Sequence, residues 1–156
     1  MQIWVDADAC PSVIREIIAK AAHNRMITTT FVANHIFSLP NSQFVTFYQV
    51  PSGFDEADKE IERRVSHGDF VITADIPLAS DVLQQGALVL TPRGERYTDN
   101  NIKQRLQMRD FMETMRASGE HTGGPSSLSL SDRKLFSDQL DRLLTGLKHR
   151  LGYTTD

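Results

Sequence analysis

The stretch Ile3-Trp4-Val5-Asp6-Ala7-Asp8-Ala9-Cys10-Pro11 decides the fold. Its first three residues form a short apolar run, which is typical of a strand covered on both faces of a sheet. Two aspartates follow this strand, and Pro11 and Ser12 suit the first turn of a helix. Apolar residues then recur over residues 13–21 with the 3.6-residue period of a helix that is buried on one side. A buried strand that leads directly into such a helix predicts an α/β unit.

The same alternation of strands and helices continues along the chain. Further strands are predicted at residues 27–32, 44–50, 70–72 and 87–90. Further helices are predicted at residues 55–65, 77–86, 101–117 and from 131 onward. We therefore expect one α/β domain over 1–156 with a mostly parallel sheet of about five strands. In this domain a helical part (93–156) packs on an α/β core (1–92).

The overall composition is that of a globular protein with little net charge. The chain has 156 residues, of which 40% are hydrophobic and 24% are charged, and its net charge is -3. Attraction to nucleic acid through a high overall positive charge is therefore excluded, and binding would need a local basic patch. Cys10 is the sole cysteine, which fits a reducing compartment. With no signal-peptide pattern and no apolar run of ~20 residues, we expect a cytoplasmic protein without membrane spans.

Several aspartates follow predicted strands or open predicted helices. Asp6 ends the first strand, Asp8 lies two residues further on, and Asp75 follows a later buried strand. Asp55 and Asp58 lie three residues apart at the start of a helix, so they share one face of that helix. Ligands of open parallel sheets bind beyond the carboxyl ends of the strands. We therefore expect these aspartates to meet at that edge of the sheet.

Carboxylates that gather in this way favour a bound cation. At ~4 Å and an effective dielectric constant near 20, each pair of carboxylates costs about 4 kcal/mol of repulsion. A divalent cation removes this repulsion, and Mg²⁺ and Mn²⁺ prefer such oxygen ligands. We predict a Mg²⁺ or Mn²⁺ site with ligands from Asp6, Asp55, Asp58 and Asp75. Asp55 and Asp75 each allow a second interpretation, as the N-cap of a helix.

Five motifs along nearly the whole chain carry a resemblance to a known family. They are Trp4–Pro11, Gly53–Asp58, Ile72–Ala79, Pro92–Gly94 and Thr122–Pro125. Together they resemble the YaiI/YqxD family, an uncharacterised bacterial family. More broadly, the first ninety or so residues resemble PIN-like nucleases. That wider resemblance implies a parallel three-layer α/β/α fold and a Mg²⁺- or Mn²⁺-dependent phosphodiesterase. The function that we expect is that of a nuclease acting on RNA.

The resemblance to PIN-like nucleases also implies roles for individual residues. Asp6, Asp58 (or Asp55) and Asp75 match the acidic positions of those proteins, and Thr73 matches a threonine whose hydroxyl would orient a carboxylate or a water molecule. Many of these enzymes have a further acidic residue downstream, for which Asp8 and Asp81 are candidates. The expected catalytic residues are therefore Asp6, Asp8, Asp58, Thr73 and Asp75.

Arginines form a second group of candidates. Arg93 follows the last predicted strand and so lies at the ligand-binding edge of the sheet. Arg105, Arg109 and Arg116 recur near helical spacing, so one face of the predicted helix 101–117 is basic. We expect these four arginines to contact RNA phosphates. An ordinary solvated helix face is the alternative interpretation for the three helical arginines.

Two other functions remain open. Val5-Asp6-Ala7-Asp8 looks like the Asp-x-Asp motif of phosphatases of the haloacid-dehalogenase type, in which the first aspartate is the nucleophile and the second the acid. Ile72-Thr73 could pass for the threonine motif of that family, but its closing acidic pair and lysine are not evident. The other alternative is a non-catalytic module that binds RNA or a nucleotide.

Overall fold

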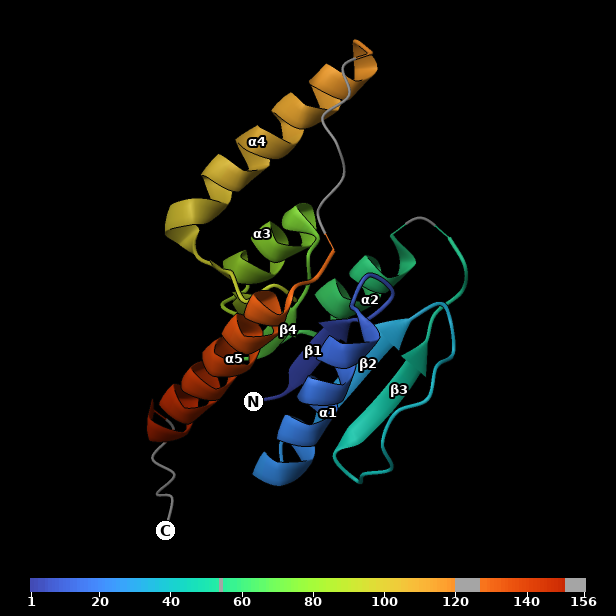
Figure 1. Cartoon of the computed structure of the whole chain (residues 1–156), viewed down its shortest axis with the longest axis vertical. Coiled ribbons are helices and arrows are strands. Elements are labelled where there is room, and N and C mark those ends of the chain that lie inside the picture. The colour runs from blue at the N-terminus through green and yellow to red at the C-terminus, as the bar shows by residue number, and fades with distance from the viewer. Residues whose placement is uncertain (54, 120–126, 151–156) are drawn as a thin grey trace.

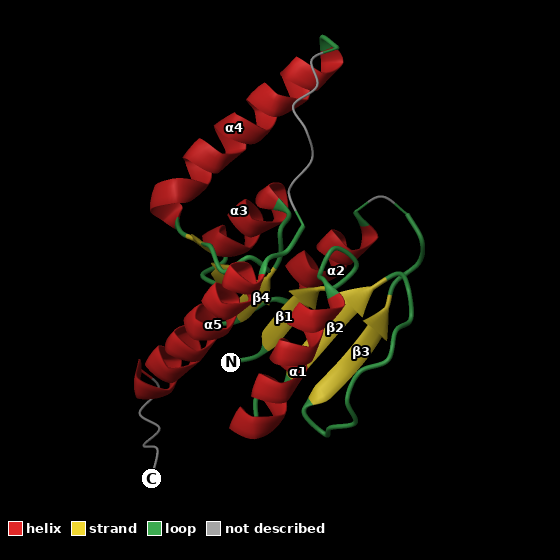
Figure 2. Ribbon diagram, in the orientation of Figure 1, coloured by secondary structure: helices red, strands yellow, loops and turns green. Residues whose placement is uncertain are grey.

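A six-stranded sheet lies between two layers of helices in the computed structural model, which describes residues 1–53, 55–119 and 127–150, the last four without their side chains (Figures 1 and 2). The strands are β1 (Ile3–Asp6), β2 (Thr29–Ala33), β3 (Val45–Gln49), β4 (Phe70–Ile72), β5 (Leu88–Leu90) and β6 (Arg96–Tyr97). The helices are α1 (Ser12–Arg25), α2 (Glu56–Arg64), α3 (Ile76–Gln84), α4 (Asp99–Ala117) and α5 (Leu130–Arg150).

The sheet is parallel except at one edge. Its strand order is β3-β2-β1-β4-β5-β6, and only β6 runs antiparallel to its neighbour. The five expected parallel strands are present. The sixth strand was not predicted, because two residues are too few to show a periodic pattern. It forms where the chain turns back after β5, with the Thr91 amide donating to the Glu95 carbonyl at 2.8 Å.

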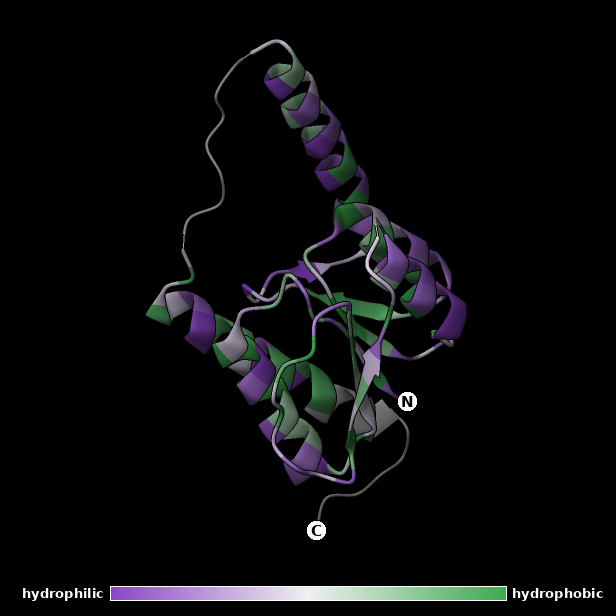
Figure 3. Cartoon of the chain, turned by 90° about the vertical axis from the view of Figure 1, so that its right-hand side faces the viewer, coloured by the Kyte–Doolittle hydropathy of each residue, from purple (hydrophilic) through white to green (hydrophobic). Residues whose placement is uncertain are grey.

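Alternate residues of the central strand β1 face the two layers of helices. Ile3 and Val5 belong to a core that includes side chains of α1 and α5, such as Ile14 and Phe136. Trp4 belongs to a second core, which takes side chains from α2, α3 and α4. In Figure 3 the strands at the centre of the molecule are mostly in the hydrophobic colour, whereas the helices show both colours. The expected three-layer α/β/α fold is confirmed.

Helix α4 reaches beyond the body of the molecule. It is anchored on α3 near its start, where Ile102 is buried, and then extends away from the sheet (Figures 1 and 3). Its outer turns expose Met108 and Phe111. None of the described helices, α4 included, is long and apolar enough to cross a membrane.

The strand order reverses at the centre of the sheet. From β1 the chain moves to β2 and β3 on one side, and from β4 it moves to β5 on the other. The connections that leave the carboxyl ends of β1 and β4 therefore diverge, and such a reversal is where open α/β sheets bind their ligands. Asp6 ends β1, and Thr73 follows directly on β4.

Asp69 ties the opposite, amino ends of these two strands together. Its buried carboxylate accepts hydrogen bonds from the backbone amides of Gln2 (3.0 Å) and Ser66 (2.9 Å) and from the Trp4 indole (3.0 Å). A buried carboxylate is tolerated only when it is paired or hydrogen-bonded. Asp69 meets that condition and fixes the start of β1 beside the start of β4.

We predict that Asp69→Ala lowers the free energy of unfolding by about 3–5 kcal/mol, because it leaves buried donors without an acceptor. Urea unfolding followed by far-UV circular dichroism measures the change. The matched control is Asp138→Ala, which removes an exposed carboxylate that pairs with Lys134 on α5 and should change the stability by less than about 1 kcal/mol. Similar losses in the two variants would contradict a special role for Asp69.

Candidate metal centre

Three aspartates meet at the starts of two helices. Asp55 and Asp58 come from the start of α2, and Asp75 immediately precedes α3. One carboxylate oxygen from each lies within 4.8 Å of the others. We call Asp55, Asp58 and Asp75 the aspartate cluster. Asp58 and Asp75 are half-buried and Asp55 is exposed, so the aspartate cluster opens to solvent on one side.

The local backbone explains how two of these side chains are aimed. Asp75 is the N-cap of α3, and its Oδ1 accepts a hydrogen bond from the Leu78 amide at 2.9 Å. Asp75 is therefore both a helix cap and a member of the aspartate cluster. Asp55 occupies the N-cap position of α2 but makes no capping bond with its side chain. Its φ of 63° lies in the left-handed region, which aspartate adopts more readily than most residues.

Asp6 is joined to the aspartate cluster through Thr73. The buried Thr73 hydroxyl donates to Asp6 Oδ2 at 2.8 Å and accepts from the Asp75 amide at 2.9 Å. A single hydroxyl thus fixes the carboxylate at the end of β1 relative to the residue that caps α3. Because a threonine side chain has few rotamers, this link holds Asp6 in one orientation.

Two carboxyl groups of this region, those of Asp6 and Asp58, have raised pKa values. Burial raises the pKa of Asp6 to about 6, and the charges of Asp75 and Asp8 add to the effect while the Thr73 hydroxyl opposes it. Burial and a hydrogen bond with Asp75 raise the pKa of Asp58 to about 8. Nearby charges, including that of Asp6, also contribute to this rise. Without a cation, Asp58 therefore keeps a proton near neutral pH.

The acidic surface extends along α2 and α3 beyond the predicted residues. A hydrogen bond with Asp81 is the largest of several causes, burial and nearby charges among them, that raise the pKa of Glu62 to about 7. Glu62 was not among the predicted site residues, although the spacing of the acidic residues in the sequence could have identified it. Asp55, Asp58 and Glu62 are spaced by three and four residues, which puts them on one face of a helix.

Asp8 forms its hydrogen bonds with the residues that follow β2, and not with the aspartate cluster. Its carboxylate accepts from the Asn34 amide at 2.9 Å and from the His35 amide at 3.4 Å, and it lies 3.4 Å from the His35 ring. Asp8 therefore braces the turn after β2. The sequence placed Asp8 beside Asp6, but the direction of its side chain depends on a contact with residues 26 and 27 positions away.

Three of the four candidate arginines lie on one helix, α4, and the fourth lies outside it. Arg93 lies between β5 and β6 and forms an ion pair with Asp132 of α5 at 3.0 Å. Arg105 pairs with a glutamate in the β5–β6 connection, and Arg109 pairs with acidic residues of its own helix. Arg116 lies in the last turn of α4. Of the four, Arg93 sits at the carboxyl edge of the sheet; the motif Thr122–Pro125 lies outside the described residues.

The donor set of the aspartate cluster suits a hard divalent cation. Its members offer only carboxylate oxygens, which Mg²⁺ and Mn²⁺ prefer over nitrogen or sulfur ligands. Burial and a hydrogen bond with Asp75 raise the pKa of Asp58, and the nearby charges of Asp75, Asp6 and Asp55, which a bound cation would offset, add to the rise. The fit therefore rests on both the geometry and the charge of Asp55, Asp58 and Asp75.

Comparisons with known proteins agree on one family. The family profile described as "Uncharacterized BCR, YaiI/YqxD family" matches residues 4–146. A UPF0178 protein of Shewanella amazonensis is 60% identical over 147 residues, which cover 94% of this chain and 99% of that protein. A UPF0178 protein of Proteus mirabilis is 55% identical over 150 residues, which cover 96% of this chain and 99% of that protein.

One solved structure also matches over most of the chain. The crystal structure of Rae1 (YacP) from Bacillus subtilis covers 93% of this chain and 99% of its own, with 16% identity and a TM-score of 0.41. The family profile and the close relatives are sufficient by themselves to show that the chain belongs to the YaiI/YqxD family.

Proposed function

We propose that the chain is a divalent-metal-dependent nuclease that hydrolyses phosphodiester bonds in RNA. The observation that carries this proposal is the convergence of Asp55, Asp58 and Asp75 within 4.8 Å, beside Asp6, where the strand order reverses. The resemblance to PIN-like nucleases supports the choice of a phosphodiester substrate, because it assigns acidic residues to these positions.

Each residue has a defined task in this proposal. Asp55, Asp58 and Asp75 would hold the cation, and the Thr73 hydroxyl fixes the orientation of the nearby Asp6 carboxylate. A bound Mg²⁺ or Mn²⁺ would neutralise the carboxylates and stabilise the charge that develops on the phosphate during hydrolysis. Asp58 would release its proton on binding the cation, because its pKa of about 8 keeps it protonated at neutral pH in the free protein.

The phosphatase alternative receives less support from the geometry. An Asp-x-Asp phosphatase needs both aspartates at the reacting phosphate, but the Asp8 carboxylate is engaged by the amides of Asn34 and His35. A non-catalytic binding module would use the same aspartate cluster for a cation without turnover. Activity measurements separate that module from a nuclease.

The first prediction from the proposed function concerns nuclease activity. The wild-type protein should cleave single-stranded RNA in the presence of Mn²⁺, and chelation should abolish the cleavage. Asp75→Asn and Asp58→Asn should each lower the rate by about 100-fold or more, since each removes a charged ligand. Gel analysis of end-labelled RNA measures the rates, with Asp138→Asn on α5 as the control. RNA binding without cleavage by the wild type would favour the binding module.

A second prediction concerns Thr73. Thr73→Val keeps the shape of the side chain but removes the hydroxyl that links Asp6 to the Asp75 amide. We expect cleavage to slow by about 10–100-fold, as is usual when a group that orients a metal ligand is lost. Thr73→Ser retains a hydroxyl and should recover most of the rate. Equal rates for the Val and Ser variants would show that the hydrogen bonds of Thr73 do not matter.

The third prediction concerns pH. The pKa of Asp6 (about 6) and that of Asp58 (about 8) exceed the ordinary value of 3.8, so the folded protein binds these protons more tightly than the unfolded chain does. Their contribution to stability is complete below pH 3.8 and is lost as the pH rises through about 6 and about 8. Without metal, the melting temperature should therefore fall over this range.

Circular dichroism melts in EDTA between about pH 5 and pH 9 measure this effect. Asp58→Asn carries a neutral amide that does not ionise, so its melting temperature should depend less on pH than that of the wild type. Added Mn²⁺ should raise the melting temperature of the wild type more at pH 8 than at pH 5.5. Parallel pH profiles for the two proteins would contradict the assigned role of Asp58.

A further inference from the structure

A pocket of about 550 Å³ opens at the same edge of the sheet as the aspartate cluster. Its wall includes Ala74, which lies in the chain between Thr73 and Asp75, and Ala9, which follows Asp8. The two sites thus share the connection from β4 to α3. Thr73 turns toward Asp6, whereas the next residue, Ala74, lines the pocket.

The chemistry of the walls suits a flat heterocycle. The apolar lining comes from Ala9, Pro11, Ala74, Pro92, Tyr97 and Leu128. Polar groups come from Thr91, Arg93 and Glu95, all in one turn, and from Ser127. A nucleobase has two apolar faces and a polar edge, and proteins bind it by stacking and by a few directed polar contacts. The pocket volume lies within the ~300–1,000 Å³ that is usual for small-molecule sites.

The polar side of the pocket is held rigidly. The Glu95 amide donates to the Thr91 hydroxyl at 3.1 Å, and the Gly94 amide donates to the Thr91 carbonyl at 2.9 Å. Gly94 has a φ of 88°, and a Cβ atom there would lie 2.8 Å from the backbone nitrogen of Phe136 in α5. The turn therefore packs directly against α5, which fixes the polar side of the pocket.

We propose that this pocket binds the base of the nucleotide next to the phosphodiester bond at the aspartate cluster. A single strand of RNA would cross the carboxyl edge of the sheet where β1 and β4 end, with a phosphate at the acidic residues and the adjoining base beside Ala74. This inference rests on the proposed nuclease function. A free mononucleotide offers the same base chemistry, so the test includes both sources.

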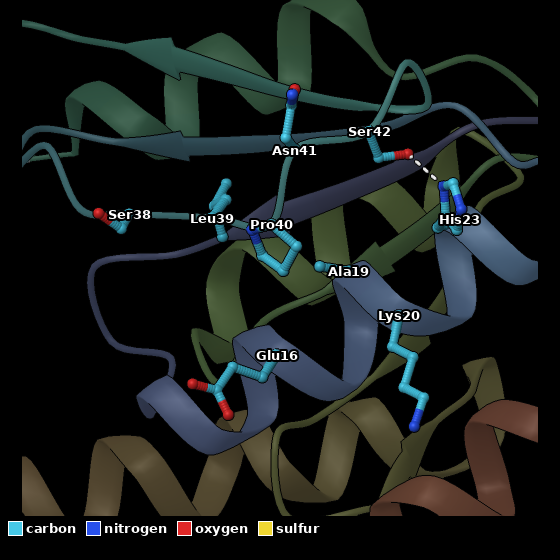
Figure 4. A pocket seen from close by; sticks show the side chains of 9 residues that line it. All are labelled: Glu16, Ala19, Lys20, His23, Ser38, Leu39, Pro40, Asn41 and Ser42. Carbon is cyan, nitrogen blue, oxygen red and sulfur yellow. Dashed lines mark hydrogen bonds between the residues drawn. The ribbon is translucent and has the colours of Figure 1, made fainter.

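Another pocket provides an internal control. It has a volume of about 620 Å³ and lies between α1 and residues 38–42, with Glu16, Lys20 and His23 on its helical side (Figure 4). It is lined by no member of the aspartate cluster and by no residue of the β4–α3 connection. It is comparable in size but has no connection to the proposed site of cleavage.

The experiment fills each pocket and measures binding. Ala74→Leu and Ala9→Leu add bulk from two different walls of the proposed base pocket, and Ser38→Leu adds bulk to the control pocket. All three positions are exposed, so the variants should fold. The probes are adenosine 5′-monophosphate, ribose 5-phosphate, and a pentaadenylate with phosphorothioate linkages that resist cleavage. Calorimetry in Mg²⁺ gives the affinities.

We expect adenosine 5′-monophosphate to bind at least tenfold more tightly than ribose 5-phosphate, and the pentamer to bind more tightly still. Ala74→Leu and Ala9→Leu should each weaken the binding of the mononucleotide and the pentamer at least tenfold, and Ser38→Leu should leave both unchanged. Equal affinity for the two monophosphates, or unchanged binding by the filled variants, would overturn the inference. A pentamer that binds no more tightly than the mononucleotide would overturn the assignment to a strand.

A Mn²⁺ titration of the same proteins separates this inference from the proposed function. If Mn²⁺ binds the wild type and the filled variants with equal affinity, and the substitutions leave nucleotide affinity unchanged, only the proposal of a base pocket is contradicted. If Mn²⁺ does not bind and RNA is not cleaved, the nuclease proposal fails. Nucleotide binding that still depends on Ala74 would then support the pocket alone.

Discussion

Repulsion among carboxylates is the constraint on which the rest of this structure depends. Burial raises the pKa of Asp58 most, and Asp75, Asp6 and Asp55 lie close enough to raise it further. A fold can hold such charges together only if other contacts stabilise it. Here the sheet is packed on both faces, and Asp69 secures the amino ends of the two central strands at the opposite edge. The stabilising contacts of Asp69 therefore lie at the amino ends of β1 and β4, and the acidic site lies at their carboxyl ends.

Much of the fold and part of the candidate site could be predicted from the sequence, for physical reasons that apply locally. Short apolar strands followed by amphipathic helices specify a parallel sheet, and a parallel sheet brings the residues after its strands to one edge. Asp6 and Asp75 follow from that rule, and the pairing of Asp55 with Asp58 follows from helical spacing. Each of these predictions needs only the position of a residue relative to its own element.

The remaining features depend on contacts between distant segments. The direction of Asp8 is set by the turn at Asn34, and the acidic pair of Glu62 and Asp81 forms because α2 and α3 lie side by side. The pairing of Arg105 likewise reflects how the start of α4 is placed against the β5–β6 connection. Residue type and spacing could not reveal these partners, because neither states which elements pack together.

The connection from β4 to α3 contributes residues both to the proposed catalytic site and to the proposed base pocket. Three consecutive residues serve three purposes there. Thr73 orients Asp6, Ala74 lines the pocket, and Asp75 caps α3 while it joins the aspartate cluster. Because β4 fixes one end of this connection and the helix cap fixes the other, the distance from the pocket to the cluster is set by the backbone. A base held in the pocket would therefore place its neighbouring phosphate without any movement of the protein.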